Sequence, residues 1–129
     1  MTNILLIRHG TTDWVDRQIL HGISDIPLNE RGLRQARQAA GALKGIEAQA
    51  LYTSPLIRCV QTALEISAVL GLAPVPREGF KELNFGWLEG KPMHDHTTQD
   101  SFSLVNLLDY YLHALIRSIS GEPMGTFQK

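Results

Sequence analysis

The sequence predicts an α/β domain in which helices flank a mostly parallel sheet. Short apolar runs alternate with longer stretches of helical periodicity, and Gly or Pro separates them. The length of 129 residues gives room for one domain, and a hydrophobic fraction of 43% suffices for a core. We therefore expect one domain over residues 1–129, with its ligand site beyond the carboxyl ends of the strands.

The first three expected elements are a strand, a helix and a second strand. Residues 3–7 form a continuous apolar run that is typical of a buried strand in a parallel sheet. Residues 30–43 have helical spacing, with Asn29 as N-cap and Gly45 where the helix should stop. Residues 48–53 predict the second strand.

A second helix, an edge strand and a third helix complete the pattern. The hydroxyl and proline of residues 54–55 indicate the start of a helix that runs to about Leu70. Residues 72–77 contain two prolines and therefore suit only an edge strand. Residues 78–98 are mostly loop, and residues 104–119 again have a helical pattern.

Charge and composition exclude several classes of function. Twelve Lys and Arg oppose thirteen Asp and Glu, so a general attraction to nucleic acid or an anionic membrane is not expected. The single cysteine, Cys59, excludes an intrachain disulfide and a cysteine-based metal site. No apolar run reaches the roughly 18–20 residues of a membrane span, and the N-terminus lacks a signal-peptide pattern. We expect a cytoplasmic protein that binds neither nucleic acid nor membrane.

Residues with phosphate chemistry follow the expected strands. Arg8, His9 and Gly10 come after the first strand, and Arg58 lies near the start of the second helix. A guanidinium binds phosphate oxygens, an imidazole is a nucleophile toward phosphorus, and a helix N-terminus favours anions. These residues predict a phosphate pocket, whereas the alternative is that Arg8 and His9 merely end a strand at the surface.

Four segments, in the same order, resemble the histidine phosphatase superfamily, the phosphoglycerate-mutase-like proteins. They lie within residues 3–90, at residues 7–14, 21–29, 52–63 and 80–90. The resemblance implies a three-layer, phosphoglycerate-mutase-like fold. It also implies hydrolysis of a phosphomonoester through a phosphohistidine, with a small phosphorylated metabolite (a sugar phosphate, a phosphoglycerate or α-ribazole phosphate) as substrate.

The resemblance also implies a role for each matching residue. His9 would be the nucleophile, and Glu82 would be the general acid that protonates the leaving alcohol. The substrate-binding residues would be Arg8, Arg58, Thr11, His21 and Gly22. No metal and no cofactor are implied, because the arginines supply the positive charge that phosphoryl transfer needs.

The sequence departs from the family pattern at three places. Val15 stands where many relatives have an asparagine that helps to bind phosphate, and residues 87–89 replace an Asp-Trp-Glu pattern. The family's second histidine, in a Ser/Thr-His-Gly segment after a later strand, has no counterpart, so residues 91–129 form a shortened C-terminal portion. The open candidates to replace that histidine are His94, His96 and His113.

These departures leave three expectations for function. The first is a histidine phosphatase of reduced activity, because losing one positioned group near a transferring phosphoryl group costs on the order of 10²–10³ in rate. The second is a catalytically inactive, phosphate-binding relative. The third is an interaction module that forms a homo-oligomer, because removing a strand and helices exposes apolar surface.

Overall fold

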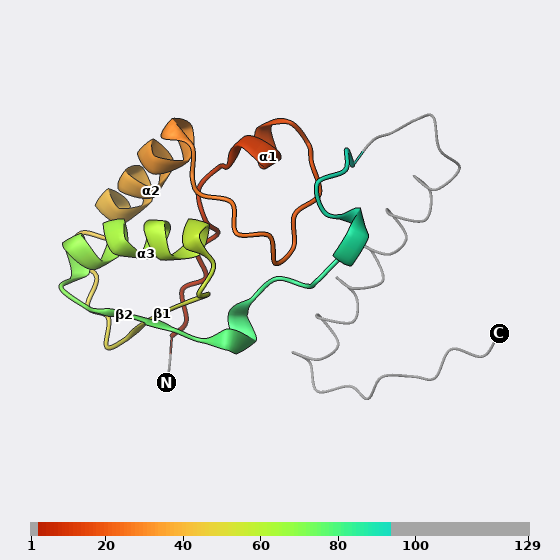
Figure 1. Cartoon of the computed structure of the whole chain (residues 1–129). Helices are drawn as coiled ribbons and strands as arrows, with labels where there is room; N and C mark the ends of the chain where they lie inside the picture. The colour runs from red at the N-terminus through yellow and green to blue at the C-terminus, as the bar shows by residue number, and fades with distance from the viewer. Residues whose placement is uncertain (1–2, 94–129) are drawn as a thin grey trace. The chain divides into compact units, whose positions relative to one another are not determined.

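The structure is a computed structural model that describes residues 3–93 (Figure 1). The described helices are α1 (Asp13–Asp16), α2 (Glu30–Ala42) and α3 (Ile57–Leu70), the strands are β1 (Leu51–Thr53) and β2 (Pro74–Pro76), and the 3-10 turns are η1 (Glu78–Phe80) and η2 (Gly86–Leu88). The chain divides into two compact units, Met1–Pro92 and Met93–Lys129. The expected helix over residues 104–119 lies outside the described residues, and the single-domain expectation stays a prediction.

The described sheet consists of two parallel strands joined by a helix. In the register of the pair, Leu51 lies beside Pro74 and Thr53 beside Pro76. Helix α3 makes the connection and packs on both strands, while α2 packs on α3. The predicted α/β class with a parallel sheet and flanking helices is confirmed, although both strands are shorter than their apolar runs. The prolines of β2 lack an N–H group, which agrees with its predicted place at an edge.

The predicted first strand is wrong for the described part of the chain. Residues 3–7 belong to no strand, and β1 pairs with β2 alone. Ile4 is 78% exposed and Leu6 is 92% exposed. An apolar run becomes a buried strand only where other segments supply hydrogen-bonding neighbours and cover both of its faces. Residues 3–93 supply neither, so the run remains an extended apolar segment on the surface.

Helix α2 begins where its sequence predicts. The Asn29 side chain accepts a hydrogen bond from the Gly32 amide at 2.9 Å and so caps the first turn. The buried residues of α2 are all small: Gly32, Ala36 and Ala40. This narrow face lets α2 approach α3 closely, which brings the chain before α2 into contact with both helices.

Helix α3 ends where expected but begins later than the predicted start at residues 54–55. Its first residue is Ile57, because the Ser54 hydroxyl accepts from the Leu56 amide at 3.4 Å and stabilises a turn before the helix. The amide of Ile57 instead donates to a carboxylate oxygen of Asp25 at 2.6 Å. The helix stops at Gly71, whose φ of 68° is a left-handed conformation that glycine adopts easily.

Candidate functional site

The loop at residues 8–11 is positioned by direct backbone packing. A Cβ atom at Gly10 would overlap the backbone of Gly32, and a Cβ atom at Gly32 would overlap the carbonyl of Thr11. The Gly10 amide donates to the Thr62 hydroxyl on α3 at 3.1 Å. Two glycines therefore allow the loop to reach both helices, and this contact fixes the backbone directly after His9.

Replacing Gly32 with alanine is expected to destabilise the fold by about 1–3 kcal/mol, because the new methyl group meets backbone that has no room to move. The matched control is Gly41→Ala on the same helix. A Cβ atom at Gly41 would meet nothing within 4 Å, so helix propensity alone should stabilise this variant by about 0.5–1 kcal/mol. Urea unfolding of both variants measures the difference, and effects of the same sign would contradict the close packing.

His9 has the protonation state that a nucleophile needs. Its Nδ1 lies 2.7 Å from the Gly10 carbonyl oxygen, which only accepts, so Nδ1–H is the donor and Nε2 keeps its lone pair. Burial lowers the pKa of His9 below 6.5, and the charges of Arg58 and Arg8 act in the same direction. The hydrogen bond to Gly10 and the charge of Glu82 oppose this shift only in part. The ring is therefore neutral near pH 7.

His21 places a second imidazole beside His9. The two ring centroids are 5.9 Å apart and the ring planes meet at 74°, an edge-to-face arrangement. Burial lowers the pKa of His21 below 6.5, and the charge of Arg58, together with that of His9 when it is protonated, lowers it further. The three histidines that the sequence offers as replacements for the family's second histidine, His94, His96 and His113, lie outside the described residues.

Stability is expected to fall as the pH drops below 6.5, because both His9 and His21 are held neutral in the folded protein. Their folded pKa values lie below the value of 6.5 that applies to the unfolded chain. Between the folded and unfolded values the unfolded chain binds more protons, so this stability is present above pH 6.5 and is lost below it. The free energy of urea unfolding, measured at pH values from about 7.5 to about 5, should show the loss. If the His9→Gln and His21→Gln variants lost as much unfolding free energy as the wild-type chain over this pH range, the two histidines would not be the cause of the loss.

Arg58 is a buried cation held by main-chain carbonyls. Only 2% of the residue is exposed, and its Nη1 and Nη2 donate to the carbonyls of Ser24 at 2.8 Å and Gly22 at 2.7 Å. Its Nε has no hydrogen-bond partner among the described residues. A buried N–H group without an acceptor is costly, and an oxygen of a bound anion would satisfy it.

Residues 19–24 run beside the loop that carries Glu82. The Leu20 amide donates to the Lys91 carbonyl and the Gly90 amide to the Leu20 carbonyl, both at 2.9 Å. The side chain of Glu82 is exposed, and its Oε1 accepts from the Leu83 amide at 3.1 Å. The charge of Glu82 raises the pKa of both imidazoles, against the dominant effects, so the structure brings this predicted acid near His9 and His21.

Glu89, on the same loop, is a carboxylate held by hydrogen bonds. Burial acts to raise its pKa, but hydrogen bonds from Ser24, Phe85 and Ile23 outweigh that effect and bring the pKa below 4.5. Glu89 is therefore ionised at neutral pH. In the sequence, Glu89 lies within the segment 80–90 that resembles the family and among residues 87–89 that depart from its pattern, and it was given no role.

A cavity of about 310 Å³ opens at His9. It is lined by Arg8, His9, Gly10, Thr11, Val15, Gln35, Ala36 and Thr62. Three of the predicted site residues, Arg8, His9 and Thr11, share this lining. The others gather at His9 without lining the cavity: His21 by ring contact, Arg58 and Glu82 by charge, and Gly22 through its hydrogen bond to Arg58. His9 thus lines the cavity and also lies within reach of the charge of the buried Arg58.

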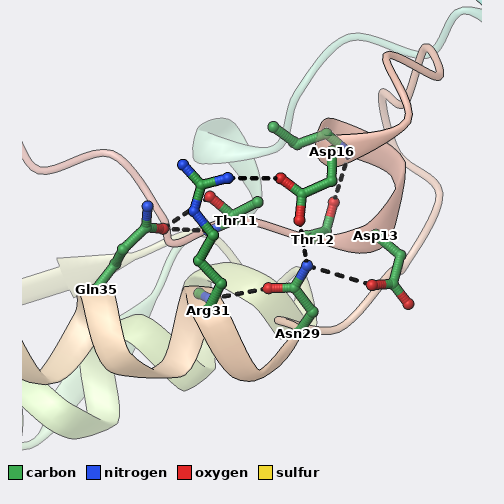
Figure 2. A network of polar contacts seen from close by, with 9 residues as sticks. Thr11, Thr12, Asp13, Asp16, Asn29, Arg31 and Gln35 are labelled. Atoms are coloured by element: carbon green, nitrogen blue, oxygen red, sulfur yellow. Dashed lines mark hydrogen bonds and ion pairs between the residues drawn. The ribbon is translucent and has the colours of Figure 1, made fainter.

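Gln35 is a site residue that sequence reasoning missed. Its Oε1 accepts from the amide of Thr11 at 2.9 Å and from the hydroxyl of Thr11 at 2.7 Å (Figure 2). The hydroxyl proton of Thr11 is therefore used within the protein, and a role for Thr11 in binding substrate stays a prediction. The signal for Gln35 was its spacing, because it follows Gly32 by one turn on the helix face that meets the loop.

A network of polar residues fixes α1 against the start of α2 (Figure 2). The side-chain nitrogen Nδ2 of Asn29 donates to Asp13 at 3.2 Å and to Asp16 at 2.8 Å. Arg31 forms an ion pair with Asp16 at 3.0 Å. These three contacts lie at the surface, where such pairs contribute little stability.

Residues 3–93 offer neither a membrane span nor a metal site. No helix there combines the length and the apolar character that crossing a membrane requires. No group of three or more His, Cys, Asp or Glu side chains in this part of the chain is arranged to hold a metal ion.

Comparison with known proteins places this chain in a family. A model of the histidine phosphatase superfamily (branch 1) matches residues 4–128. The chain is similar to the uncharacterized phosphatase PhoE of Bacillus subtilis (strain 168), with 42% identity over 97 residues that make up 75% of this chain and 50% of the relative. It is also similar to the probable phosphoglycerate mutase GpmB of Yersinia pestis (strain Pestoides F), with 36% identity over 100 residues, 78% of this chain and 46% of the relative.

The solved structures agree with these matches. The phosphoserine phosphatase of Entamoeba histolytica, in complex with 3-phosphoglyceric acid, aligns with a TM-score of 0.61 and 32% identity over 71% of this chain and 47% of that structure. The chain thus spans about half the length of the relatives it matches. The phosphoglycerate-mutase-like fold and the short length that the sequence predicts are both confirmed. The chain belongs to the histidine phosphatase superfamily.

Proposed function

We propose that this site hydrolyses a phosphomonoester through a phosphohistidine at His9. The observation that supports this most directly is the hydrogen bond from His9 Nδ1–H to the Gly10 carbonyl, with a lowered pKa that keeps Nε2 unprotonated. The buried guanidinium of Arg58 lies near enough to His9 to influence that pKa. A neutral nucleophile beside a fixed cation is the arrangement that phosphoryl transfer requires.

The proposed reaction has two steps. Nε2 of His9 forms a bond to phosphorus while the bond between phosphorus and the ester oxygen breaks, and Glu82 gives its proton to the leaving alcohol. A water oxygen then forms a bond to phosphorus while the bond between phosphorus and Nε2 breaks; the water gives a proton to Glu82, and inorganic phosphate leaves. Arg8, Arg58 and His21 stabilise the charge on the phosphoryl oxygens in both steps.

The proposed substrate is a small phosphorylated metabolite, such as a sugar phosphate, a phosphoglycerate or α-ribazole phosphate. A cavity of about 310 Å³ is at the small end of ligand sites. Hydrolysis is favoured over mutase chemistry because Val15 presents an apolar wall to the cavity. Its side chain has no hydrogen-bonding group with which to hold a phosphorylated intermediate.

The experiment is a hydrolysis assay of the full chain with p-nitrophenyl phosphate at acidic and neutral pH. The reaction is quenched rapidly, and intact-protein mass spectrometry detects the added phosphoryl group. An acid-labile, alkali-stable phosphoenzyme supports the proposal. Absence of both turnover and phosphoenzyme, with retained binding of vanadate, would instead establish a phosphate-binding relative, an alternative favoured by the exposure of Glu82.

The second alternative is an interaction module that forms a homo-oligomer. The observation that favours it is the exposure of the apolar side chains at residues 4–7, which are 42% to 92% exposed. Exposed apolar segments of this kind promote association between chains. A homo-oligomer that acts as an interaction module would show as a mass above 14.4 kDa in light scattering. A monomer at all concentrations would remove this alternative.

A further inference from the structure

We infer that Glu89 is a positioning residue that sets the orientation of Arg58 through the intervening segment Gly22–Ser24. The inference rests on the proposed function for its effect on turnover, but the contact itself is measurable without any activity. It assigns a purpose to a carboxylate of the site region that the proposed reaction does not use.

The carboxylate of Glu89 accepts hydrogen bonds at both oxygens. Oε1 accepts from the amides of Ile23 at 3.1 Å and Phe85 at 3.0 Å. Oε2 accepts from the amide of Ser24 at 2.8 Å and from its hydroxyl. The ion pairs found in residues 3–93 do not include Glu89. Its charge is therefore balanced by main-chain dipoles, which have fixed directions.

The same segment supplies both carbonyls that hold Arg58. The peptide unit between Gly22 and Ile23 donates its N–H to Glu89 and presents its carbonyl to Nη2 of Arg58 at 2.7 Å. In a trans peptide these two groups point in opposite directions, so the unit bridges the carboxylate and the guanidinium. Ser24 makes both kinds of contact through two successive peptide units, since its amide donates to Glu89 and its carbonyl, in the following unit, accepts from Nη1 at 2.8 Å.

This bridge determines where the guanidinium points. Arg58 has a long, flexible side chain, and within the described residues its hydrogen bonds are these two, since Nε has no partner. Hydrogen bonds in series polarise one another, so a carboxylate on the N–H side strengthens the carbonyl as an acceptor. Without the carboxylate, the segment would lose the acceptor that fixes its amides, and the carbonyls that aim Arg58 would be free to rotate.

Glu89 also links this segment to the loop of the proposed general acid. Its bond to the Phe85 amide lies three residues after Glu82. A Cβ atom at Gly22 would overlap the Leu83 carbonyl and approach Glu89 Oε1 at 2.6 Å, so segment and loop are packed without space between them. One carboxylate thus holds together the two pieces of chain that position Arg58 and Glu82.

The test is Glu89→Gln, which keeps the size of the side chain but replaces one acceptor oxygen with an NH₂ group that only donates. We expect kcat/KM for p-nitrophenyl phosphate to fall on the order of 10²-fold, because misplacing a binding group costs about this much, with a parallel loss of vanadate affinity. Ser24→Ala, which removes only the hydroxyl contact, should lose less. The matched control is Glu78→Gln, an exposed carboxylate paired with Lys81, which should behave as wild type.

An NMR measurement separates positioning from a general loss of structure and from failure of the proposed function. In Glu89→Gln, exchange of the Arg58 Nε–H with solvent should accelerate at least tenfold and the Ile23 and Ser24 amides should shift, while amides in α2 stay unchanged. If the wild-type chain neither hydrolyses nor binds phosphate, the proposed function fails and this measurement alone decides the inference. Unchanged Arg58 exchange, or equal changes throughout the unit, would overturn it.

Discussion

Replacing His9 with alanine is expected to reduce hydrolysis of p-nitrophenyl phosphate by a factor on the order of 10⁴ or more and to remove the phosphoenzyme entirely. Nε2 of His9 is the atom that would bond to phosphorus, and the arginines that remain can bind phosphate but cannot accept it covalently. Steady-state kinetics and trapping of the phosphoenzyme by intact mass measure the two effects separately.

The fold should survive this substitution, which makes the kinetic result interpretable. His9 is only half-buried, its hydrogen bond goes to the carbonyl of the next residue, and its contact with His21 is a ring contact without a hydrogen bond. Urea unfolding at pH 7.5 serves as the control, because the neutral imidazole contributes no charge there. Turnover that persists at the wild-type rate in a folded His9→Ala chain would reject the mechanism.

Local signals in the sequence predicted those elements whose ends are fixed by neighbouring residues. Asn29 caps α2 from the adjacent position and Gly71 ends α3 from the adjacent position, so both ends follow from short-range chemistry. The start of α3 could not be found in this way, because the carboxylate that receives its first amide belongs to Asp25, 32 residues earlier in the chain. A capping partner supplied by the tertiary fold leaves no local pattern.

The error at residues 3–7 has a related cause. Apolar runs report that a segment prefers to be buried, but burial also requires a neighbour, and the described residues contain none for this run. The apolar pattern therefore identified a segment that prefers burial, but it could not show whether the described part of the chain provides a neighbouring strand for it.

The residues of the candidate site likewise fall into those that the sequence could predict and those that it could not. His9, Arg8 and Arg58 could be predicted because their residue types at these spacings match phosphate chemistry, and Glu82 because its segment resembles the family; the charges of the other three act on the pKa of His9. Gln35 and Glu89 were missed because their side chains accept hydrogen bonds from main-chain amides. Nearly every residue type has such an amide, so the partner leaves no signal in the sequence. Such contacts form where segments that are distant in the sequence approach each other, and only the structure shows where that happens.

Replacing Arg58 with lysine is expected to weaken vanadate binding and to reduce kcat/KM by a factor on the order of 10²–10³, although the positive charge is kept. The planar guanidinium reaches two carbonyls, of Gly22 and Ser24, and still has N–H groups to offer an anion. A lysine ammonium is a single point on a flexible chain and cannot hold both carbonyls and an anion in one plane.

The same substitution should destabilise the fold by about 1–3 kcal/mol, because at least one buried carbonyl loses its donor. The matched control is Arg34→Lys on α2, an exposed side chain whose ion pair with Glu30 is 4.0 Å long, and it should change stability by less than about 0.5 kcal/mol. Calorimetric titration with vanadate and urea unfolding test both effects. Wild-type vanadate affinity in Arg58→Lys would mean that the buried charge alone, rather than the fork held by Gly22 and Ser24, attracts the phosphoryl group.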